Sequence, residues 1–405
     1  MAIARKALVV GGGIIGVTSA YTLARDGWQV RLIEREDAIA RGASLGNGRQ
    51  LSYSHTNALG SPRMLPQIPG LLLGCNDAFR LSLRPDLGFM AWLLRFLGNS
   101  THGAYRRNTL ETLTLANRSR DAMEALLSNH PIEFDQRKVG KMVLLRGDKE
   151  VRSARESMEM KKQVGLKQVL LRTEEACEIE PALAQSLDPL TGVLYSPDDE
   201  TGDCNAFARE LCALAQSEYG LQLITGSSVR SIERGSNETR VSLDNGDELA
   251  THLLVISSGH DANQLLAPLG HRLPIEPMKG YSFTAPLGNA PPRVSITDSK
   301  RRIVFTNIGD RMLVAGIAEI GRLDLSIDPA RLDSMKQAAR ETLPEAAIYS
   351  DSDEGWVGYR PLTPNSQPIT RQLERGIAVN SGHGMLGWTL AMGSAERLTE
   401  LVTAG

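Results

Sequence analysis

Cysteine is scarce in this chain, and the few cysteines form no pattern. Of the 405 residues only Cys75, Cys177, Cys204 and Cys212 are cysteine, with no CxxC pair and no histidine at metal-ligand spacing. This arrangement predicts neither a metal site nor a disulfide framework. Unpatterned cysteines are typical of a reducing compartment, so we expect a cytoplasmic protein.

An excess of charge of one sign is missing as well. The formal net charge is -2 at pH 7, which gives no reason to expect a nucleic-acid partner. The hydrophobic share of 41% is ordinary for a globular protein. Because a single hydrophobic core usually stops growing at about 250–300 residues, a chain of 405 residues predicts two domains.

No apolar run is long enough to cross a membrane. The longest one outside the glycine-rich motifs, residues 87–97, is interrupted by Arg95, whereas a spanning helix needs about 20 apolar residues. Such a stripe usually packs in a core, but as an amphipathic helix it is also suited to peripheral contact with the inner face of the cell membrane. Arg5 and Lys6 precede an apolar stretch as in a signal peptide. Cleavage there would remove the motif described next, so we expect a strand instead.

What the sequence does contain starts with a glycine motif near the N-terminus. Residues 9–16 read VVGGGIIG and stand between an apolar strand and a helical pattern, and Glu34 closes the next strand-like stretch. In this GxGxxG arrangement Gly11 allows a tight turn, Gly13 lets the backbone approach a pyrophosphate, and Gly16 lets the helix pack on the strand. Free N–H groups at the start of the helix attract phosphates, and Glu34 would bind ribose hydroxyls. The motif predicts a dinucleotide site, for FAD or NAD.

A second glycine cluster, near the C-terminus, indicates which of the two cofactors binds. Residues 380–389 read NSGHGMLGWT and precede a helical pattern that continues to residue 402. A simple NAD-binding domain has no need of a second dinucleotide-facing loop at its far end, so FAD is favoured. The N–H groups and the dipole at the start of this helix would stabilise negative charge on a flavin.

With both glycine motifs the chain resembles the D-amino-acid oxidase-like FAD-dependent oxidoreductases, and within them most closely the bacterial D-amino-acid dehydrogenases. The resemblance implies an α/β fold, with a Rossmann-like FAD-binding domain and a discontinuous substrate domain built on an antiparallel sheet. We expect residues 1–84, 198–270 and 351–405 in the FAD-binding domain, and residues 85–197 and 271–350 in the substrate domain. The matching segments are 11–16, 44–50 (SLGNGRQ), 199–204 (DETGDC), 279–282 (KGYS), 358–364 (GYRPLTP) and 382–389.

The motifs and the resemblance together identify the residues expected to bind FAD. In relatives, the loop that matches residues 44–50 contacts the flavin or its phosphates. The strand that starts at residue 229 lies near the adenine, and the main chain of the C-terminal motif contacts the flavin. The predicted FAD-binding residues are Gly11, Gly13, Ile14, Ile15, Gly16, Glu34, Arg35, Ser44, Asn47, Gly48, Gln50, Leu51, Val229, Ser258, Gly259, Gly382, His383, Gly384, Met385, Leu386, Gly387, Trp388 and Thr389.

Arg360 is the leading candidate for binding the substrate. A guanidinium group matches a carboxylate with two parallel hydrogen bonds, and in relatives the arginine of this GxRP motif binds the substrate carboxylate; a structural ion pair is the alternative. Tyr53, His55 and Tyr281 are further catalytic candidates, because two follow the flavin loop and the third stands at the expected roof of the flavin. Arg49 replaces a small residue of the relatives. A cation there would attract an acidic substrate side chain or offset flavin charge, unless it simply faces solvent.

The resemblance implies an enzyme that oxidises a D-amino acid. FAD would accept the Cα hydrogen as hydride, the imino acid would hydrolyse to a 2-oxo acid and ammonia, and electrons would pass to a quinone or another carrier. Alternatives within the family are an oxidase that uses oxygen, and a dehydrogenase of D-hydroxyproline, other cyclic imino acids or N-methylated glycine. A flavin-carrying electron-transfer subunit of a hetero-oligomer is the alternative from another class. The sequence leaves the oligomeric state open.

Overall fold

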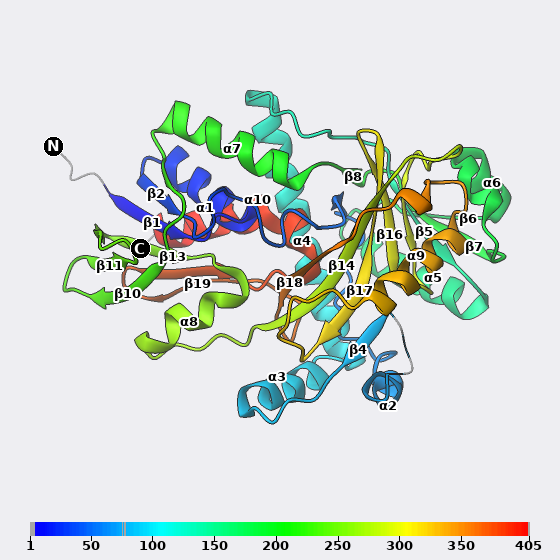
Figure 1. The fold of residues 1–405 in the computed structure, drawn as a ribbon, viewed down its shortest axis with the longest axis horizontal. Coiled ribbons are helices and arrows are strands. Elements are labelled where there is room, and N and C mark those ends of the chain that lie inside the picture. The colour runs from blue at the N-terminus through cyan, green and yellow to red at the C-terminus, as the bar shows by residue number, and fades with distance from the viewer. Residues whose placement is uncertain (1–4, 75, 77, 404–405) are drawn as a thin grey trace.

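The computed structural model describes residues 5–74, 76 and 78–403, and two large sheets lie side by side in it (Figure 1). In the described part the first sheet has six strands in the order β19-β20-β13-β1-β2-β9. Neighbouring strands run parallel, except that β19 runs antiparallel to β20. Parallel strands are covered on both faces, which explains why β13 is apolar and buried throughout. The strands are β1 (Lys6–Val10), β2 (Gln29–Ile33), β9 (Gln222–Ile224), β13 (Leu253–Ile256), β19 (Ile369–Glu374) and β20 (Ile377–Ser381).

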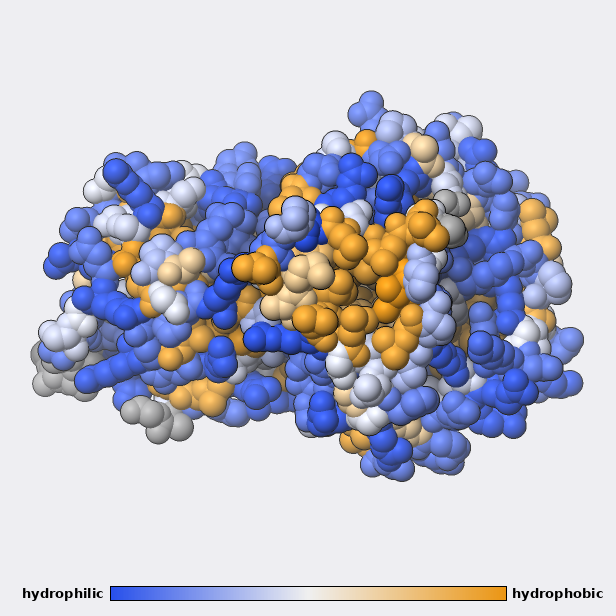
Figure 2. Space-filling view, turned by 90° about the horizontal axis from the view of Figure 1, so that it is seen from below, coloured by the Kyte–Doolittle hydropathy of each residue, from blue (hydrophilic) through white to orange (hydrophobic). Residues whose placement is uncertain are grey.

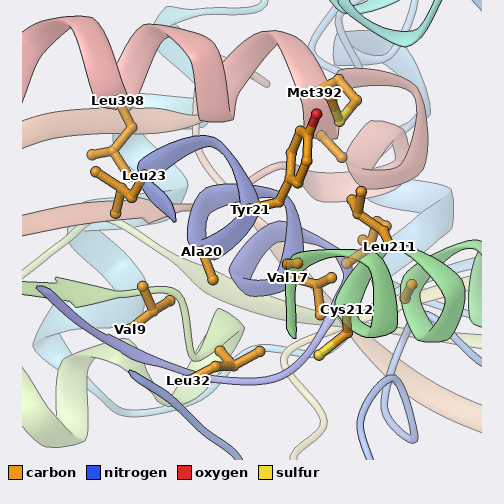
Figure 3. Packing of buried hydrophobic residues seen from close by; sticks show 14 of the residues in the cluster. Val9, Val17, Ala20, Tyr21, Leu23, Leu32, Leu211, Cys212, Met392 and Leu398 are labelled. Carbon is orange, nitrogen blue, oxygen red and sulfur yellow. The ribbon is translucent and has the colours of Figure 1, made fainter. Parts of the chain in front are cut away.

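Helices cover one face of the six-stranded sheet, and a small sheet covers the other. Because side chains alternate across a strand, Ala7 and Val9 face the helices, whereas Leu8 and Val10 face the small sheet. Figure 3 shows the helical side, where Val9 and Leu32 meet side chains of α1, α7 and α10. The helices are α1 (Ile14–Arg25), α4 (His102–Asn129), α7 (Cys204–Tyr219) and α10 (Gly387–Thr403). The other face carries β10 (Val229–Arg234), β11 (Thr239–Leu243), β12 (Glu248–Thr251) and α8 (Ala262–Leu266).

The second sheet is larger and mostly antiparallel. Eight of its nine described strands follow the order β18-β14-β17-β16-β15-β5-β7-β6, and the ninth, β4, pairs with β17 outside this path. The helices α6 (Thr173–Ile179) and α9 (Pro329–Thr342) pack on one face, and α5 (Asp148–Lys162) covers β5 and β7 on the other. The strands are β4 (Phe79–Leu81), β5 (Lys141–Leu145), β6 (Val169–Leu171), β7 (Gly192–Ser196), β14 (Glu276–Pro286), β15 (Ser295–Asp298), β16 (Ile303–Ile308), β17 (Arg311–Ile320) and β18 (Trp356–Leu362).

Two further helices, α2 (Ile68–Leu72) and α3 (Leu87–Gly98), lie lowest in the view of Figure 1. The apolar segment at 87–97 thus forms a helix. Its Trp92 and Phe96 rings stack with centroids 5.3 Å apart in the core, while Leu87 and Leu94 are exposed. The short strands β3 (Gln50–Leu51) and β8 (Glu200–Thr201) pair with each other. Throughout the described residues, no helix has both the length and the apolar character that a membrane span requires.

Three elements pack with a different sheet from the one that the predicted domain division implies. α4 lies in the segment expected in the substrate domain, yet its Leu115, Met123 and Leu126 belong to the core of the six-stranded sheet. β4 and β18 lie in segments expected in the FAD-binding domain, yet both are strands of the second sheet. An apolar pattern shows that an element has a buried face, but not which sheet covers it. The division into domains otherwise stays a prediction.

Candidate active site

One cavity of about 1520 Å³ is lined by residues of both large sheets. Its wall includes the turn after β1, the loop at residues 42–50, the start of α10, and residues of β16, β17, β18 and α5. Cavities for drug-sized ligands measure about 300–1,000 Å³. This cavity therefore has room for an extended dinucleotide together with a small substrate.

The N-terminal glycine motif forms the turn that the sequence predicts. Gly11 has a φ of +107°, and a Cβ added to it would lie 2.7 Å from the carbonyl oxygen of Ser257. A Cβ on Gly16 would lie 1.7 Å from the carbonyl oxygen of Gly11, so α1 packs tightly on the strand there. Among the described atoms, a Cβ on Gly13 would meet only Ser44 Oγ, at 3.7 Å. The space in front of Gly13 belongs to the cavity, which is what a bound pyrophosphate requires.

Glu34 follows β2 directly and faces the same cavity. Its Oε2 accepts a hydrogen bond from the Gly12 N–H at 2.6 Å, and its Oε1 accepts one from the Glu36 N–H at 3.0 Å. The carboxylate is therefore held where ribose hydroxyls would reach it. The predicted residues Arg35, Val229, Ser258 and Gly259 line this end, together with Ser227, Ser228, Asp261 and Gln264, which the sequence analysis missed. Ser227 and Ser228 follow β9, and Asp261 and Gln264 belong to the helical segment after β13.

The loop at residues 44–50 is held by a hydrogen bond to α1 and by one within the loop. Ser44 Oγ accepts from the Ile14 N–H at 3.0 Å, and Asn47 Oδ1 accepts from the Arg49 N–H at 2.7 Å. Ser44, Asn47, Gly48 and Gln50 all line the cavity, as predicted. Arg49 Nη1 lies 3.1 Å from Asp203 Oδ2, and only 18% of its side chain is exposed. Arg49 is therefore neither a solvent-facing residue nor a free cation for an acidic substrate.

The C-terminal motif forms the cavity wall at the start of α10. His383 Nε2 lies 2.9 Å from Ser394 Oγ, and burial lowers the pKa of His383 to about 3, so the ring is neutral. His383 Nδ1 and Trp388 Nε1 are buried on this wall with no hydrogen-bond partner among the described residues. An unsatisfied buried polar group costs about 1–3 kcal/mol, so the wall fits a polar ligand such as an isoalloxazine ring. The predicted residues Ile14, Ile15, Gly384, Met385, Leu386, Gly387 and Thr389 also line the cavity.

Three predicted FAD-binding residues do not line the cavity themselves. Gly16 packs against Gly11, as described above. Leu51 is fully buried in the core, because Gln50 faces the cavity and neighbouring strand residues point to opposite sides. Gly382 adopts a φ of +83°, and a Cβ there would lie 2.7 Å from the Thr363 side chain. All three shape the wall, and their positions do not support the direct contact that we expected.

Arg360 reaches into the cavity across the neighbouring strand β14. A Cβ on Gly280 of β14 would lie 2.4 Å from its guanidinium carbon, so glycine leaves room for this side chain. Its Nη1 donates to the carbonyl oxygen of Ile317 at 3.3 Å. Burial lowers the pKa of Arg360 to about 10, which still leaves the group charged at neutral pH, and no described residue forms an ion pair with it. This geometry does not agree with the alternative of a structural ion pair.

Of the other three catalytic candidates, His55 lines the cavity and two do not. Tyr53 is buried in the core of the six-stranded sheet. The Tyr281 hydroxyl donates to Glu319 Oε2 at 3.1 Å, and its ring packs in the core of the second sheet. Because a Cβ on Gly280 would point at the Arg360 guanidinium, the side chain of the next residue on the strand points to the opposite face of the sheet. The positions of Tyr53 and Tyr281 therefore do not support contact with a substrate.

A cluster of buried charges next to His55 was missed by the sequence analysis. Lys141 Nζ donates to Gln50 Oε1 at 2.9 Å, and Lys161 Nζ donates to a main-chain carbonyl at 2.9 Å. Burial lowers the pKa of Lys141 to about 8 and that of Lys161 to about 7, and it raises the pKa of Asp199 to about 6. Burial and the two lysines also hold the pKa of His55 well below its usual range, so His55 is neutral. The sequence signal was a single lysine at the head of the apolar strand KMVLL.

No metal site accompanies these groups in the part of the chain that the structure describes. There, no three His, Cys, Asp or Glu side chains are grouped so that they could hold an ion. The cavity thus offers a dinucleotide cradle, a charged group for a carboxylate and a neutral imidazole.

Comparison with known proteins identifies the family. The family model described as FAD dependent oxidoreductase matches residues 6–401, and the chain belongs to this family. It is 32% identical over 406 residues to a D-amino acid dehydrogenase of Vibrio vulnificus, covering 98% of this chain and 96% of the relative. A D-amino acid dehydrogenase of Paramagnetospirillum magneticum is 35% identical over 404 residues, covering 98% and 95%.

Solved structures with the same fold include two amino-acid oxidoreductases. Glycine oxidase from Geobacillus kaustophilus superposes with a TM-score of 0.76 at 21% identity, covering 99% of this chain and 95% of that one. L-proline dehydrogenase from P. horikoshii gives a TM-score of 0.74 at 21% identity, covering 100% and 95%. These findings confirm the predicted fold class and the predicted cofactor, FAD.

Proposed function

We propose that the protein is a dehydrogenase that oxidises D-amino acids to 2-oxo acids and ammonia. The observation that carries this proposal is Arg360, a charged guanidinium group on the cavity wall with no acidic partner among the described residues. Burying an unpaired charge is costly, and a substrate carboxylate would remove that cost. The two relatives at 32% and 35% identity, both named D-amino acid dehydrogenase, support the choice of substrate.

The residues of the cavity divide the work of such a reaction. FAD, when bound, supplies the acceptor for the hydride from Cα. Arg360 holds the carboxylate with two hydrogen bonds and so fixes the position of Cα. His55 is neutral, with a buried Nδ1 that has no described partner, and is suited to accept a hydrogen bond from the substrate amine. The N–H groups at the start of α10 favour negative charge on the adjoining part of the cofactor.

Reduction of the bound flavin by amino acids without oxygen tests this function. With the carboxylate and the Cα–H direction both set, inversion at Cα exchanges the places of the amine and the side chain, so the two enantiomers should react at different rates. The relatives named D-amino acid dehydrogenase support the direction, and we expect D-isomers to bleach the flavin faster than their L-isomers. The panel includes D- and L-alanine, D- and L-proline, glycine and N-methylglycine. Faster reduction by an L-isomer than by every D-isomer would overturn the proposal. No bleaching by any member would favour a flavin-carrying electron-transfer subunit.

Replacing Arg360 tests where the carboxylate binds. Loss of a charged hydrogen bond costs about 1.5–3 kcal/mol, so we expect Arg360→Lys to lower kcat/KM on the order of 10- to 150-fold. Arg360→Ala should lower it further, while FAD content stays near that of the wild type. If Arg360→Ala retains kcat/KM within about threefold, the carboxylate is held elsewhere.

An apolar surface at the mouth of the cavity supports a membrane-dissolved electron acceptor. Figure 2, seen from below Figure 1, shows hydrophobic residues gathered over one area of this face. Leu325 is 52% exposed and also lines the cavity, so the cavity reaches the surface here. The exposed apolar residues of α2, α3 and the adjoining loops are Leu65, Leu72, Leu73, Leu83, Leu87, Met90, Leu94, Leu323 and Leu325.

The occupant that fits this surface best is a lipid bilayer. All its large exposed residues are leucine or methionine, whereas protein interfaces are enriched in tyrosine, tryptophan and arginine. α3 exposes Leu87, Met90 and Leu94 along one stripe while burying three aromatic rings on the other. Arg95 is exposed in the same helix and can meet anionic headgroups. We therefore infer peripheral membrane binding, with a quinone entering the cavity from the bilayer.

Flotation with vesicles of phosphatidylcholine and phosphatidylglycerol tests this surface. We expect the wild-type protein to bind, and the double variant Leu87→Ser with Leu94→Ser to lose binding while it still reduces soluble dyes. Leu187→Ser is a matched control, because Leu187 and Leu94 are both 67% exposed but Leu187 lies outside the surface. Absence of vesicle binding by the wild type would overturn the inference. If the double variant instead changes from dimer to monomer, the surface binds a second copy.

A further inference from the structure

Arg302 places a second cation on the cavity wall. It ends a run of three basic residues, and its two neighbours are neutralised: Lys300 Nζ lies 3.0 Å and Arg301 Nη1 2.9 Å from Asp188 Oδ2. Arg302 has a left-handed backbone, with a φ of +54°, and its side chain lines the cavity instead. A non-glycine residue in this conformation is uncommon and often marks a functional position.

The contacts of Arg302 are all uncharged. Its Nη2 donates to Gln67 Oε1 at 3.1 Å, and its guanidinium carbon lies 5.0 Å from the centre of the Phe79 ring. Burial lowers its pKa from the usual value, and no described residue forms an ion pair with it. Two acids that line the cavity, Glu150 and Glu156, have other partners. Glu150 Oε2 accepts from a backbone N–H at 2.7 Å, and Glu156 Oε2 lies 3.9 Å from an arginine of another loop.

Arg360 contacts β17 directly, and Arg302 packs on Phe79 of β4, the strand that pairs with the same stretch of β17. The strand order is β18-β14-β17-β16, with Arg360 on β18 and Arg302 directly before β16. Arg360 donates to the carbonyl oxygen of Ile317. Phe79, next to the Arg302 guanidinium, pairs with Ala318 in the sheet. Two unpaired cations therefore face one cavity across residues 317–318.

We propose that Arg302 binds a second carboxylate, and that the preferred substrates are dicarboxylic amino acids. This rests on the proposed function, because Arg360 is taken to hold the α-carboxylate. A substrate with one carboxylate leaves Arg302 with neutral partners only. A side-chain carboxylate would give it a charge-assisted pair in a partly buried site, where such pairs are strongest. Arg49, the cation suspected from the sequence, is already paired with Asp203, so its charge is compensated.

Acids and their amides provide the sharpest test, because they differ in charge at nearly constant shape. We expect kcat/KM for D-glutamate and D-aspartate to exceed that for D-glutamine and D-asparagine on the order of 10- to 150-fold. Arg302→Gln should reduce the ratio to near one and leave kcat/KM for D-alanine within about threefold. Lys300→Gln removes the same charge outside the cavity and should keep the ratio. A wild-type ratio near one, or an unchanged ratio in Arg302→Gln, overturns the proposal.

A binding measurement separates this proposal from the proposed function. Glutarate carries two carboxylates and no amine, so it binds without reacting, and butyrate is its counterpart with one carboxylate. By calorimetry we expect glutarate to bind the FAD-loaded wild type at least tenfold more tightly than butyrate, and Arg302→Lys to keep part of that difference. If no D-amino acid is oxidised but this preference holds and Arg302→Gln abolishes it, the dicarboxylate site stands and the reaction is wrong. Equal affinity for glutarate and butyrate would overturn the proposed dicarboxylate site, even if the protein oxidises D-alanine.

Discussion

At the scale of single residues, neighbours on one strand have opposite roles. Gly280 leaves space for Arg360 in the cavity, while Tyr281 points into the core and donates to Glu319. We expect Tyr281→Phe to lower the free energy of unfolding by about 1 kcal/mol through loss of this hydrogen bond. The kcat/KM of the variant should stay within about twofold of the wild-type value. Urea denaturation measures the change in stability, and steady-state kinetics measure kcat/KM. A tenfold loss of kcat/KM with FAD retained would return Tyr281 to the set of catalytic residues.

The buried lysines should make stability depend on pH. Lys161 has a pKa of about 7 in the folded protein, against about 10.4 for an unperturbed lysine. Between these values the unfolded chain binds more protons, so stability should rise as the pH increases from about 7 to about 10. Lys161→Met removes this contribution. The variant should therefore gain most stability over the wild type below pH 7, and this gain should decline towards pH 10. Each unit of pKa shift of Lys161 corresponds to about 1.4 kcal/mol of that gain.

Urea denaturation at pH 6.5, 8 and 9.5 measures this trend. Lys162→Met is the matched control, since the next lysine along the chain has 74% of its side chain exposed. The control should follow the wild type at every pH. A constant difference between Lys161→Met and the wild type across the range would mean that Lys161 does not titrate there.

At the scale of elements, substitutions at Gly13 and Gly16, which follow β1, should have different effects. A side chain on Gly13 enters the cavity, so Gly13→Val should fold but contain little FAD, because the valine occupies the place of the pyrophosphate. A side chain on Gly16 collides with the backbone of Gly11, so Gly16→Ala should separate α1 from β1 and yield little folded protein. Flavin absorbance per protein and circular dichroism distinguish the two results. Full FAD content in Gly13→Val would contradict this placement of the pyrophosphate.

At the scale of the whole molecule, FAD should hold the two sheets together. Residues of both sheets line the one cavity, so a ligand in it contacts both halves. A ligand that binds only the folded state at 100 times its Kd adds about 2.7 kcal/mol. We therefore expect removal of FAD to lower Tm, and added FAD to raise it progressively in one cooperative transition. Two transitions, with only one responding to FAD, would show that the halves unfold independently.

Much of the cofactor site could be predicted from the sequence, because its determinants are local. Gly11 and Gly13 stand in a motif whose spacing sets the turn, and the residue after β2 is an acid in the expected place. The C-terminal cluster runs directly into the first turn of α10. In each case a few consecutive residues specify both the backbone conformation and the group that it presents. Such a pattern can therefore be recognised in the sequence without knowledge of the fold.

The substrate side could be predicted only in part, because contacts across strands decide it. A tyrosine in KGYS gives no sign of which face of its strand is buried. In the fold, Tyr281 packs in the core, while the preceding Gly280 lies under the Arg360 side chain. Lys141, Lys161 and Asp199 are distant in sequence and meet only in the folded chain. The sequence by itself determined the family, the cofactor cradle and the role expected for Arg360. Only the tertiary structure decided that Arg49 is paired and that Arg302 is free, because pairing depends on which acid the fold brings within reach.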